Sequence, residues 1–266
     1  MTRYAAMFER CRARGEGALG AFVMLGDPGL DASAAYLDAL VAGGADMLEL
    51  GIPFSDPVAD GPVIQAAAGR ALAAGVRTAD CLRLLAELRA RHRDIPVGVL
   101  TYANIVAARG IDRFARELAE AGVDSLLVAD VPTLEAAPYA AAAKAGNIDL
   151  VMIAATNTPP EKLAQIAALT SGYTYCVARA GVTGADDALS LDHRALFEGL
   201  VGAGAPPPVL GFGIATPEHV AQALASGAAG VISGSAIVRR IGEGQSPDQI
   251  ATFVTTLKAA TKALRN

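Results

Sequence analysis

The stretch VDSLLVADVPTLEAAPYAAAAKA, residues 123–145, joins the two patterns that decide the fold of this chain. Residues 123–129 form a short apolar run of strand length. Residues 134–145 are rich in alanine and carry apolar residues at helical spacing. A strand followed by a helix predicts a parallel β–α unit, because parallel strands need a long crossover connection.

Eight such apolar runs follow one another along the 266 residues. Their starts lie about 30 residues apart, which suits one strand, one helix and two loops per unit. Eight sequential units favour a closed (β/α)8 TIM barrel over an open sheet, because closure leaves no exposed sheet edge. The predicted strands are residues 19–25, 46–52, 96–102, 123–129, 149–154, 173–178, 207–212 and 229–233.

The rest of the chain fits one such barrel. Residues 1–14 predict a short amphipathic N-terminal helix, and the long gap after the second strand predicts an insertion there. We find no proline- or serine-rich linker, so we expect a single domain over residues 1–266. Asp31, Thr78 and Thr216 are expected N-caps. The predicted outer helices are residues 31–42, 63–73, 78–92, 111–121, 134–145, 161–170, 192–201, 217–225 and 247–263.

Composition excludes several classes of protein. The chain has 22 Lys and Arg against 27 Asp and Glu, a net charge of −5, so we expect no binding to nucleic acid or to an anionic membrane. The three cysteines and three histidines show no ligand spacing, so we expect neither a metal site nor a disulfide. With no secretory signal and no membrane span in the sequence, we expect a soluble cytoplasmic protein.

Glu49 is the first candidate catalytic residue. Strand alternation places Leu48 and Leu50 on one face and Glu49 on the other, toward the barrel mouth. Burial there raises the pKa of a carboxyl group, and a group that exists in both protonation states suits general acid–base catalysis. The alternative is a structural carboxylate satisfied by backbone donors.

The loop after that strand, PFSDPVADG at residues 53–61, holds two more acids. Asp60 is the better candidate, since it lies directly before Gly61-Pro62 and the next helix. Asp56 is explained equally well by a local Asx turn.

Two glycine-containing turns predict a phosphate site. Gly211-Phe212-Gly213 follows the seventh strand and Gly234-Ser235-Ala236 the eighth, where barrels commonly bind phosphate through backbone amides and a helix N-terminus. Residues 179–184, with two glycines, are a candidate flap over the same pocket. Four positions stay open. Tyr175 points into the mouth or packs in the core, Tyr102 and Asn104 line a pocket or cap a loop, and Asp130 binds a ligand or starts a turn.

The run LELGIPFSDPVADGP, residues 48–62, resembles the signature of the tryptophan synthase α subunit family. Residues 25–28, 127–132, 179–184, 211–214 and 234–238 resemble further motifs of that family, in the same order over essentially the whole chain. The resemblance implies retro-aldol cleavage of indole-3-glycerol phosphate to indole and glyceraldehyde 3-phosphate, without a metal or a Schiff base.

The resemblance also implies residue roles. Glu49 would be the acid–base residue, Asp60 would accept a hydrogen bond from the indole N–H, and Thr183 would meet Asp60 on loop closure. Met24 stands at a position of the first strand where family members often carry a threonine. The phosphate would be held by Gly184, Gly213, Gly234 and Ser235, and the indole pocket would be lined by Phe22, Leu100, Tyr175 and Phe212.

As a member of this family the chain would hold no cofactor itself. It would pair with a β subunit that carries pyridoxal phosphate, in an α2β2 heterotetramer, and Asp56 would then serve that interface. Two alternatives remain. Another phosphosugar barrel, such as an isomerase or a prenyl transferase, would keep the glycines without needing Glu49 and Asp60, and a subunit that only binds or activates would need neither acid.

Overall fold

We describe a computed structural model of the chain, which covers residues 1–177 and 193–262. The predicted flap and its candidates Thr183 and Gly184 lie outside these described residues.

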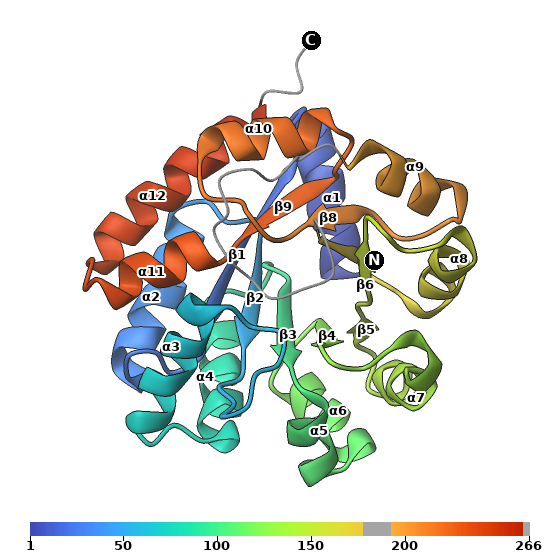
Figure 1. The fold of residues 1–266 in the computed structure, drawn as a ribbon. Coiled ribbons are helices and arrows are strands. Elements are labelled where there is room, and N and C mark those ends of the chain that lie inside the picture. The colour runs from blue at the N-terminus through green and yellow to red at the C-terminus, as the bar shows by residue number, and fades with distance from the viewer. Residues whose placement is uncertain (178–192, 263–266) are drawn as a thin grey trace.

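The strands form one parallel sheet that curls into a barrel with helices around it (Figure 1). Its order is β5-β4-β3-β2-β1-β9-β8-β7-β6, which confirms the predicted TIM barrel. The strands are β1 Ala18–Met24, β2 Met47–Gly51, β3 Val97–Thr101, β4 Ser125–Val128, β5 Asp149–Leu150, β6 Ile153–Ala155, β7 Thr174–Val177, β8 Pro208–Leu210 and β9 Gly230–Ser233.

The fifth predicted strand is interrupted. Val151 and Met152 separate β5, which pairs with β4, from β6, which pairs with β7. The backbone N–H of Val151 donates to Leu126 on one side, and the carbonyl of Met152 accepts from Tyr175 on the other. The two short pieces therefore act as one barrel strand and close the sheet.

Most predicted helices are present, within a few residues at their ends. The helices are α1 Arg3–Ala13, α2 Leu30–Ala42, α3 Pro62–Ala73, α4 Thr78–Arg91, α5 Ala103–Arg109, α6 Ile111–Glu120, α7 Ala137–Ala145, α8 Pro160–Leu169, α9 Arg194–Gly202, α10 Pro217–Ala225, α11 Ser235–Gly242 and α12 Pro247–Ala259. Helix α3 is the predicted insertion after β2, whereas α5 after β3 and α11 after β9 were not predicted as helices.

The predicted helix starts need two corrections. Thr216 is the N-cap of α10 and accepts from the amide of His219, as expected. Asp31 and Thr78 lie inside their helices instead, because Gly29 and Arg77 take the N-cap positions. Asp80 in the first turn of α4 accepts from the Arg77 amide and supplies the capping hydrogen bond there.

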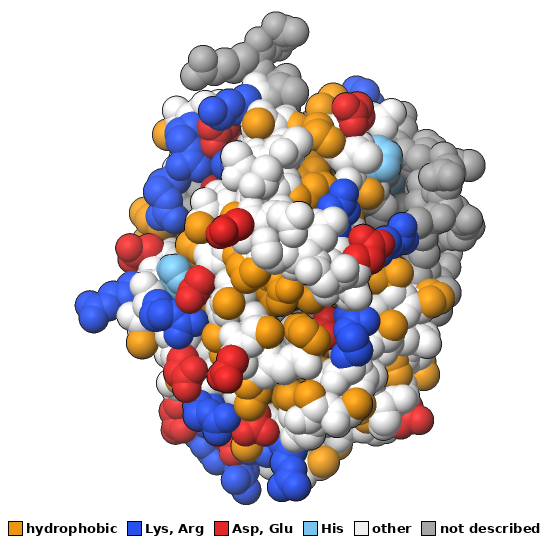
Figure 2. Space-filling view, turned by 90° about the vertical axis from the view of Figure 1, so that its left-hand side faces the viewer, with side chains coloured by type: hydrophobic (Ala, Val, Ile, Leu, Met, Phe, Trp, Pro, Cys, Tyr) orange, Lys and Arg blue, Asp and Glu red, His pale blue; other side chains and the backbone are white. Residues whose placement is uncertain are grey.

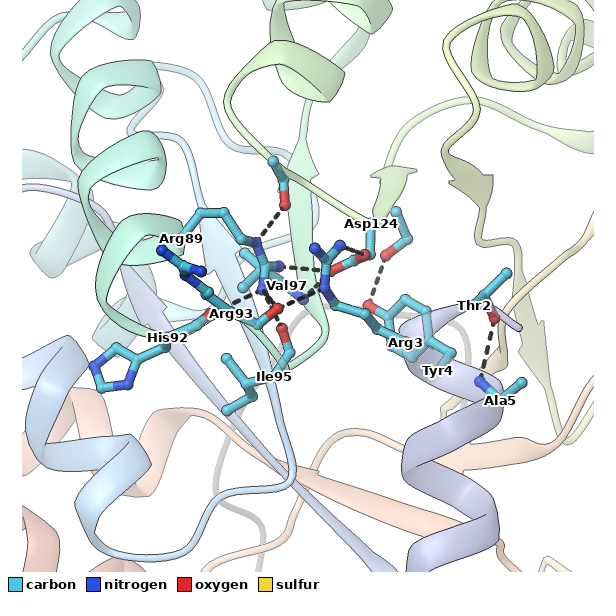
Figure 3. A network of polar contacts seen from close by, with 12 residues as sticks. Thr2, Arg3, Tyr4, Ala5, Arg89, His92, Arg93, Ile95, Val97 and Asp124 are labelled. Carbon is cyan, nitrogen blue, oxygen red and sulfur yellow. Dashed lines mark hydrogen bonds and ion pairs between the residues drawn. The ribbon is translucent and has the colours of Figure 1, made fainter.

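Helix α1 closes the amino end of the barrel, opposite the ends of the strands that carry the candidate site. Figure 3 shows Arg3 of α1 and Arg89 of α4 converging on the carboxylate of Asp124, with N···O distances of 2.8 and 2.7 Å. The same Arg89 guanidinium also donates to the carbonyl oxygens of His92 and Ile95. This part-buried network ties the helix to the loops that lead into β3 and β4.

Charges of both signs are mixed on the surface that Figure 2 shows. Lys and Arg side chains lie beside Asp and Glu side chains around the margin of this face, and its centre is largely uncharged. No continuous basic patch crosses this face, in keeping with the net charge of −5. Among the described residues, no helix combines the length and apolar character that crossing a membrane requires.

Candidate active site

Glu49 lies inside the barrel, as the strand alternation predicts. Its side chain is 1% exposed, and its Oε1 accepts a hydrogen bond of 2.9 Å from the hydroxyl of Tyr173. Tyr173 directly precedes β7, which is not a neighbour of β2 in the sheet, so this bond crosses the interior. No group among the described residues binds Oε2. The alternative of a carboxylate satisfied by backbone donors is therefore wrong.

Burial changes the protonation of Glu49. It raises the pKa of the carboxyl group to about 8, and the hydrogen bond from Tyr173 opposes this shift. The group is therefore mostly protonated near pH 7 and titrates close to neutrality, which suits a proton donor and acceptor.

A layer of aromatic and polar groups supports Glu49 from the amino end of the barrel. The rings of Tyr173 and Tyr4 lie 5.2 Å apart, and the Tyr4 hydroxyl lies 2.8 Å from the Ser125 hydroxyl. Gly98 makes room for this layer, since a Cβ atom there would lie 2.6 Å from Ser125 Oγ. Our sequence analysis missed the roles of Tyr4 and Tyr173, although Tyr173 shares the strand parity of Tyr175.

Asp60 is also buried, at 7% exposure. Burial raises the pKa of its carboxyl group to about 6, and a hydrogen bond from the Tyr102 hydroxyl opposes this shift. The same hydroxyl accepts from the amide of Ala59 at 3.3 Å, and the Tyr102 ring stacks on Phe54 at 5.3 Å. Tyr102 therefore holds the loop after β2 in place. Of the two alternatives left open for it, it lines the pocket beside Asp60.

Tyr175 is influenced by both acids. Burial first, and then the charges of Glu49 and Asp60, raise the pKa of Tyr175 well above its usual value. Its ring meets Phe212 edge-on at 6.4 Å. Tyr175 therefore belongs to the mouth of the barrel.

Apolar side chains cover the space around Glu49. Phe22 lies opposite Glu49 in the strand register, and Leu100 lies opposite Gly51 at the end of β3. A Cβ atom at Gly51 would lie 2.9 Å from Phe22 and 3.0 Å from the sulfur of Met24. Phe22 and Met24 therefore form one wall of the pocket next to Glu49. Met24 is buried, at 3% exposure.

The two glycine-containing turns meet beside Phe22. Phe212 and Gly213 both have positive φ angles, 74° and 76°, a strained backbone for a phenylalanine. The Ser233 hydroxyl donates to the Ile214 carbonyl at 2.7 Å and fixes this turn against β9. Gly234 packs on Phe22, since a Cβ atom at Gly234 would lie 3.4 Å from the Phe22 side chain.

Helix α11 begins directly after Gly234. The first N–H groups of a helix have no intrahelical acceptor, and here the amides of Gly213 and Gly234 also bind no acceptor within the described residues. These donors, with the positive end of the α11 dipole, fit the phosphate site predicted from the sequence.

Three other positions stand outside this cluster. Asp130 accepts from the amide of Ala103 at 2.8 Å and thereby caps α5. Asn104 is exposed on α5, and Asp56 is exposed in the loop after β2, where it accepts from the Ser55 hydroxyl. The three cysteines are buried free thiols, and no group of potential metal ligands was found in the part of the chain that the structure describes.

The raised pKa of Glu49 predicts how stability depends on pH. Because the folded state holds the Glu49 proton more tightly than the unfolded state, the unfolding free energy should decrease as the pH rises from about 4.5 to 8. The loss is about 5 kcal/mol at most, from the size of the shift. In Glu49→Gln this contribution disappears, so the variant should match wild type at pH 4 and be more stable at pH 9. Urea unfolding at both pH values measures this, and equal stabilities at pH 9 would contradict the raised pKa.

Comparison with known proteins agrees with this geometry. The family Tryptophan synthase alpha chain matches residues 8–266. The chain is 50% identical to the tryptophan synthase alpha chain of Shewanella amazonensis, over 98% of this chain and 100% of that one. It is 52% identical to that of Klebsiella pneumoniae, over 98% and 99% of the two chains.

Solved structures give the same result. The Mycobacterium tuberculosis tryptophan synthase structure superposes with a TM-score of 0.89 at 32% identity, over 98% of both chains. The Legionella pneumophila tryptophan synthase alpha chain does so with a TM-score of 0.86 at 31% identity, over 98% of this chain and 97% of that one. The chain belongs to the tryptophan synthase α chain family.

Proposed function

We propose that this chain, as a tryptophan synthase α chain, cleaves indole-3-glycerol phosphate to indole and glyceraldehyde 3-phosphate by a retro-aldol reaction. The observation that carries the proposal is the pair of buried carboxyl groups with raised pKa values, about 8 for Glu49 and about 6 for Asp60, whose charges both act on Tyr175. An isomerase or transferase of a phosphosugar has no need for this pair.

Glu49 supplies both proton transfers. In its neutral form it donates a proton to the indole ring carbon that bears the side chain. Its carboxylate then takes the proton of the hydroxyl on the adjoining side-chain carbon, while the bond between the two carbons breaks and its electrons return to the ring. The proton on Glu49 is thereby restored, and no other acid or base is consumed.

Asp60 stabilises the charge that this protonation creates. Protonation of the ring carbon leaves positive charge on the indole nitrogen. With a pKa of about 6, Asp60 is mostly ionised at pH 7 and accepts a hydrogen bond from that N–H. The hydrogen bond from the Tyr102 hydroxyl keeps the Asp60 carboxylate in place.

The remaining predicted residues hold the substrate at its two ends. Phe22, Leu100, Tyr175 and Phe212 enclose the indole ring, with Met24 above Glu49. The amides of Gly213, Gly234 and Ser235 and the Ser235 hydroxyl bind the phosphate, and Gly184 and Thr183 of the flap complete the site.

The partner in this proposal is a β subunit, which consumes the indole with the pyridoxal phosphate that it carries, in an α2β2 assembly. This chain needs no cofactor for its own step. The loops near the site expose apolar side chains, with Val58 at 72% and Leu134 at 81% exposure, and Asp56 lies on the same loop as Val58. The three reduced cysteines fit a cytoplasmic location.

The test is steady-state release of indole from indole-3-glycerol phosphate, with and without a saturating β subunit. We expect slow release by the isolated chain and faster release with the partner, because closure of the loops over the substrate is completed in the complex. Binding without release in both conditions would indicate a subunit that has lost catalysis. Turnover unaffected by the β subunit would contradict the proposed partnership.

A further inference from the structure

Asp27 has no part in the proposed chemistry, although it follows the end of β1 on the site's side of the barrel. Its carboxylate is buried at 3% exposure and is turned toward Arg70 of α3. The guanidinium donates from Nε to one carboxylate oxygen and from Nη2 to the other, both at 2.7 Å. This is a two-pronged ion pair, the geometry that gives arginine its strongest and most directional contact with a carboxylate.

The pair joins three segments. Asp27 belongs to the loop after β1, and Arg70 to the last turns of α3. The guanidinium also lies against the last residue of α11, since a Cβ atom at Gly242 would be 3.2 Å from both of its terminal nitrogens. Helices α3 and α11 lie side by side beyond β1 (Figure 1), and both contact β1.

Both helices begin at the candidate site and meet again at Arg70. Helix α3 begins two residues after Asp60, and α11 begins at Ser235 of the phosphate site. Arg70 lies about 12 Å along α3 from Pro62, and Gly242 about 10 Å along α11 from Ser235, at the rise of an α-helix. Arg70 is therefore too far along both helices to contact a phosphate at the start of α11.

We propose that the Asp27–Arg70 ion pair is a positioning pair that fixes α3 relative to α11 and so sets the span between Asp60 and the phosphate-binding amides. The proposal rests on the proposed function, in which one substrate reaches from Asp60 to the start of α11. A ligand that spans both ends depends on this distance, whereas a ligand that fills only the phosphate end does not.

Two ligands separate these cases. The spanning probe is 3-(indol-3-yl)propyl phosphate, which has the ring, the three-carbon chain and the phosphate but no hydroxyl group to react. The short probe is glycerol 3-phosphate, which reaches only the phosphate site. Titration calorimetry of the full chain gives both dissociation constants, and the binding stoichiometry of glycerol 3-phosphate reports the folded fraction.

Arg70→Lys keeps the charge but removes the two-pronged geometry, and Asp27→Asn removes the charge of the partner. In both variants we expect the Kd of the spanning probe to rise about tenfold or more, since displacements of about 1 Å at a site have effects of this size. The Kd of glycerol 3-phosphate should stay within about twofold of wild type, because the start of α11 itself is unchanged. The KM for indole-3-glycerol phosphate should rise with the Kd of the spanning probe.

Asp124→Asn is the matched control. It breaks another largely buried ion pair, that of Asp124 with Arg89 at the amino end of the barrel, with 12% and 13% side-chain exposure, together with the contact of Asp124 to Arg3. It should lower the melting temperature but leave the ratio of the two Kd values as in wild type. A folding defect alone would reduce the stoichiometry and leave that ratio unchanged.

The outcomes are distinct. A ratio that rises in Arg70→Lys and Asp27→Asn but not in Asp124→Asn supports the positioning role. If Asp27→Asn does not fold, the half-buried Arg70 still tests the role through Arg70→Lys. An unchanged ratio in the folded variants overturns it. If wild type itself binds the spanning probe no better than glycerol 3-phosphate, the proposed function fails, and the positioning role with it.

Discussion

Glu49→Gln is expected to lower the rate of indole release from indole-3-glycerol phosphate by about 10² to 10⁴-fold, the range that general acid–base catalysis supplies. The amide has the shape of the protonated carboxyl group and still accepts the hydrogen bond from Tyr173, so the pocket should keep its form. It has no proton of suitable pKa to give to the ring, and it takes none from the hydroxyl. The loss therefore appears in kcat, while the Kd of 3-(indol-3-yl)propyl phosphate stays within about twofold.

The pH profile of the wild-type chain provides a second measurement. Since burial raises the pKa of Glu49 to about 8, kcat should decrease as the pH rises through that value and the acid loses its proton. Glu87→Gln, an exposed acid on α4, is the control and should leave both the rate and the profile unchanged. Turnover in Glu49→Gln equal to that of wild type would remove Glu49 from the mechanism.

The barrel could be predicted because its signals are local. Each strand is a short apolar run and each outer helix has its own periodicity, so eight repeats suffice to predict the order of the units. Helices α5 and α11 were missed because they are only seven and eight residues long and directly follow strands. The break at Val151 and Met152 gives no sequence signal either, since the apolar run continues through it.

The site was predicted where strand alternation, a loop position or a glycine marks a residue, as for Glu49, Asp60 and the two glycine-containing turns. Contacts between residues distant in the chain have no such mark. Tyr173 meets Glu49 across 124 positions of sequence, and Arg70 meets Asp27 across 43, so both partnerships require the folded barrel. The protonation of Glu49 follows from its burial in the folded barrel, which outweighs the hydrogen bond from Tyr173.

Gly211→Ala should reduce kcat/KM by about 10²-fold or more, although it adds a single methyl group. A Cβ atom at Gly211 would lie 2.1 Å from the hydroxyl oxygen of Tyr175 and 2.2 Å from the ring carbon that bears it. The backbone cannot retreat easily, since the Gly211 amide donates to Cys176 at 2.9 Å. The ring of Tyr175 must therefore move, and with it the contact to Phe212 and the side of the pocket next to both acids.

A double-mutant cycle distinguishes this collision from a general loss of stability. Tyr175→Leu removes the atoms that the new methyl group would strike, so Gly211→Ala combined with Tyr175→Leu should be more active than Gly211→Ala alone, although Tyr175→Leu by itself loses activity. Gly69→Ala in α3 is the control, because a Cβ atom there has no neighbour within 4 Å. Measuring kcat/KM for the four variants and wild type tests the contact. If the losses of Gly211→Ala and Tyr175→Leu simply multiply, the two residues act independently and the close approach of Tyr175 to Gly211 does not shape the pocket.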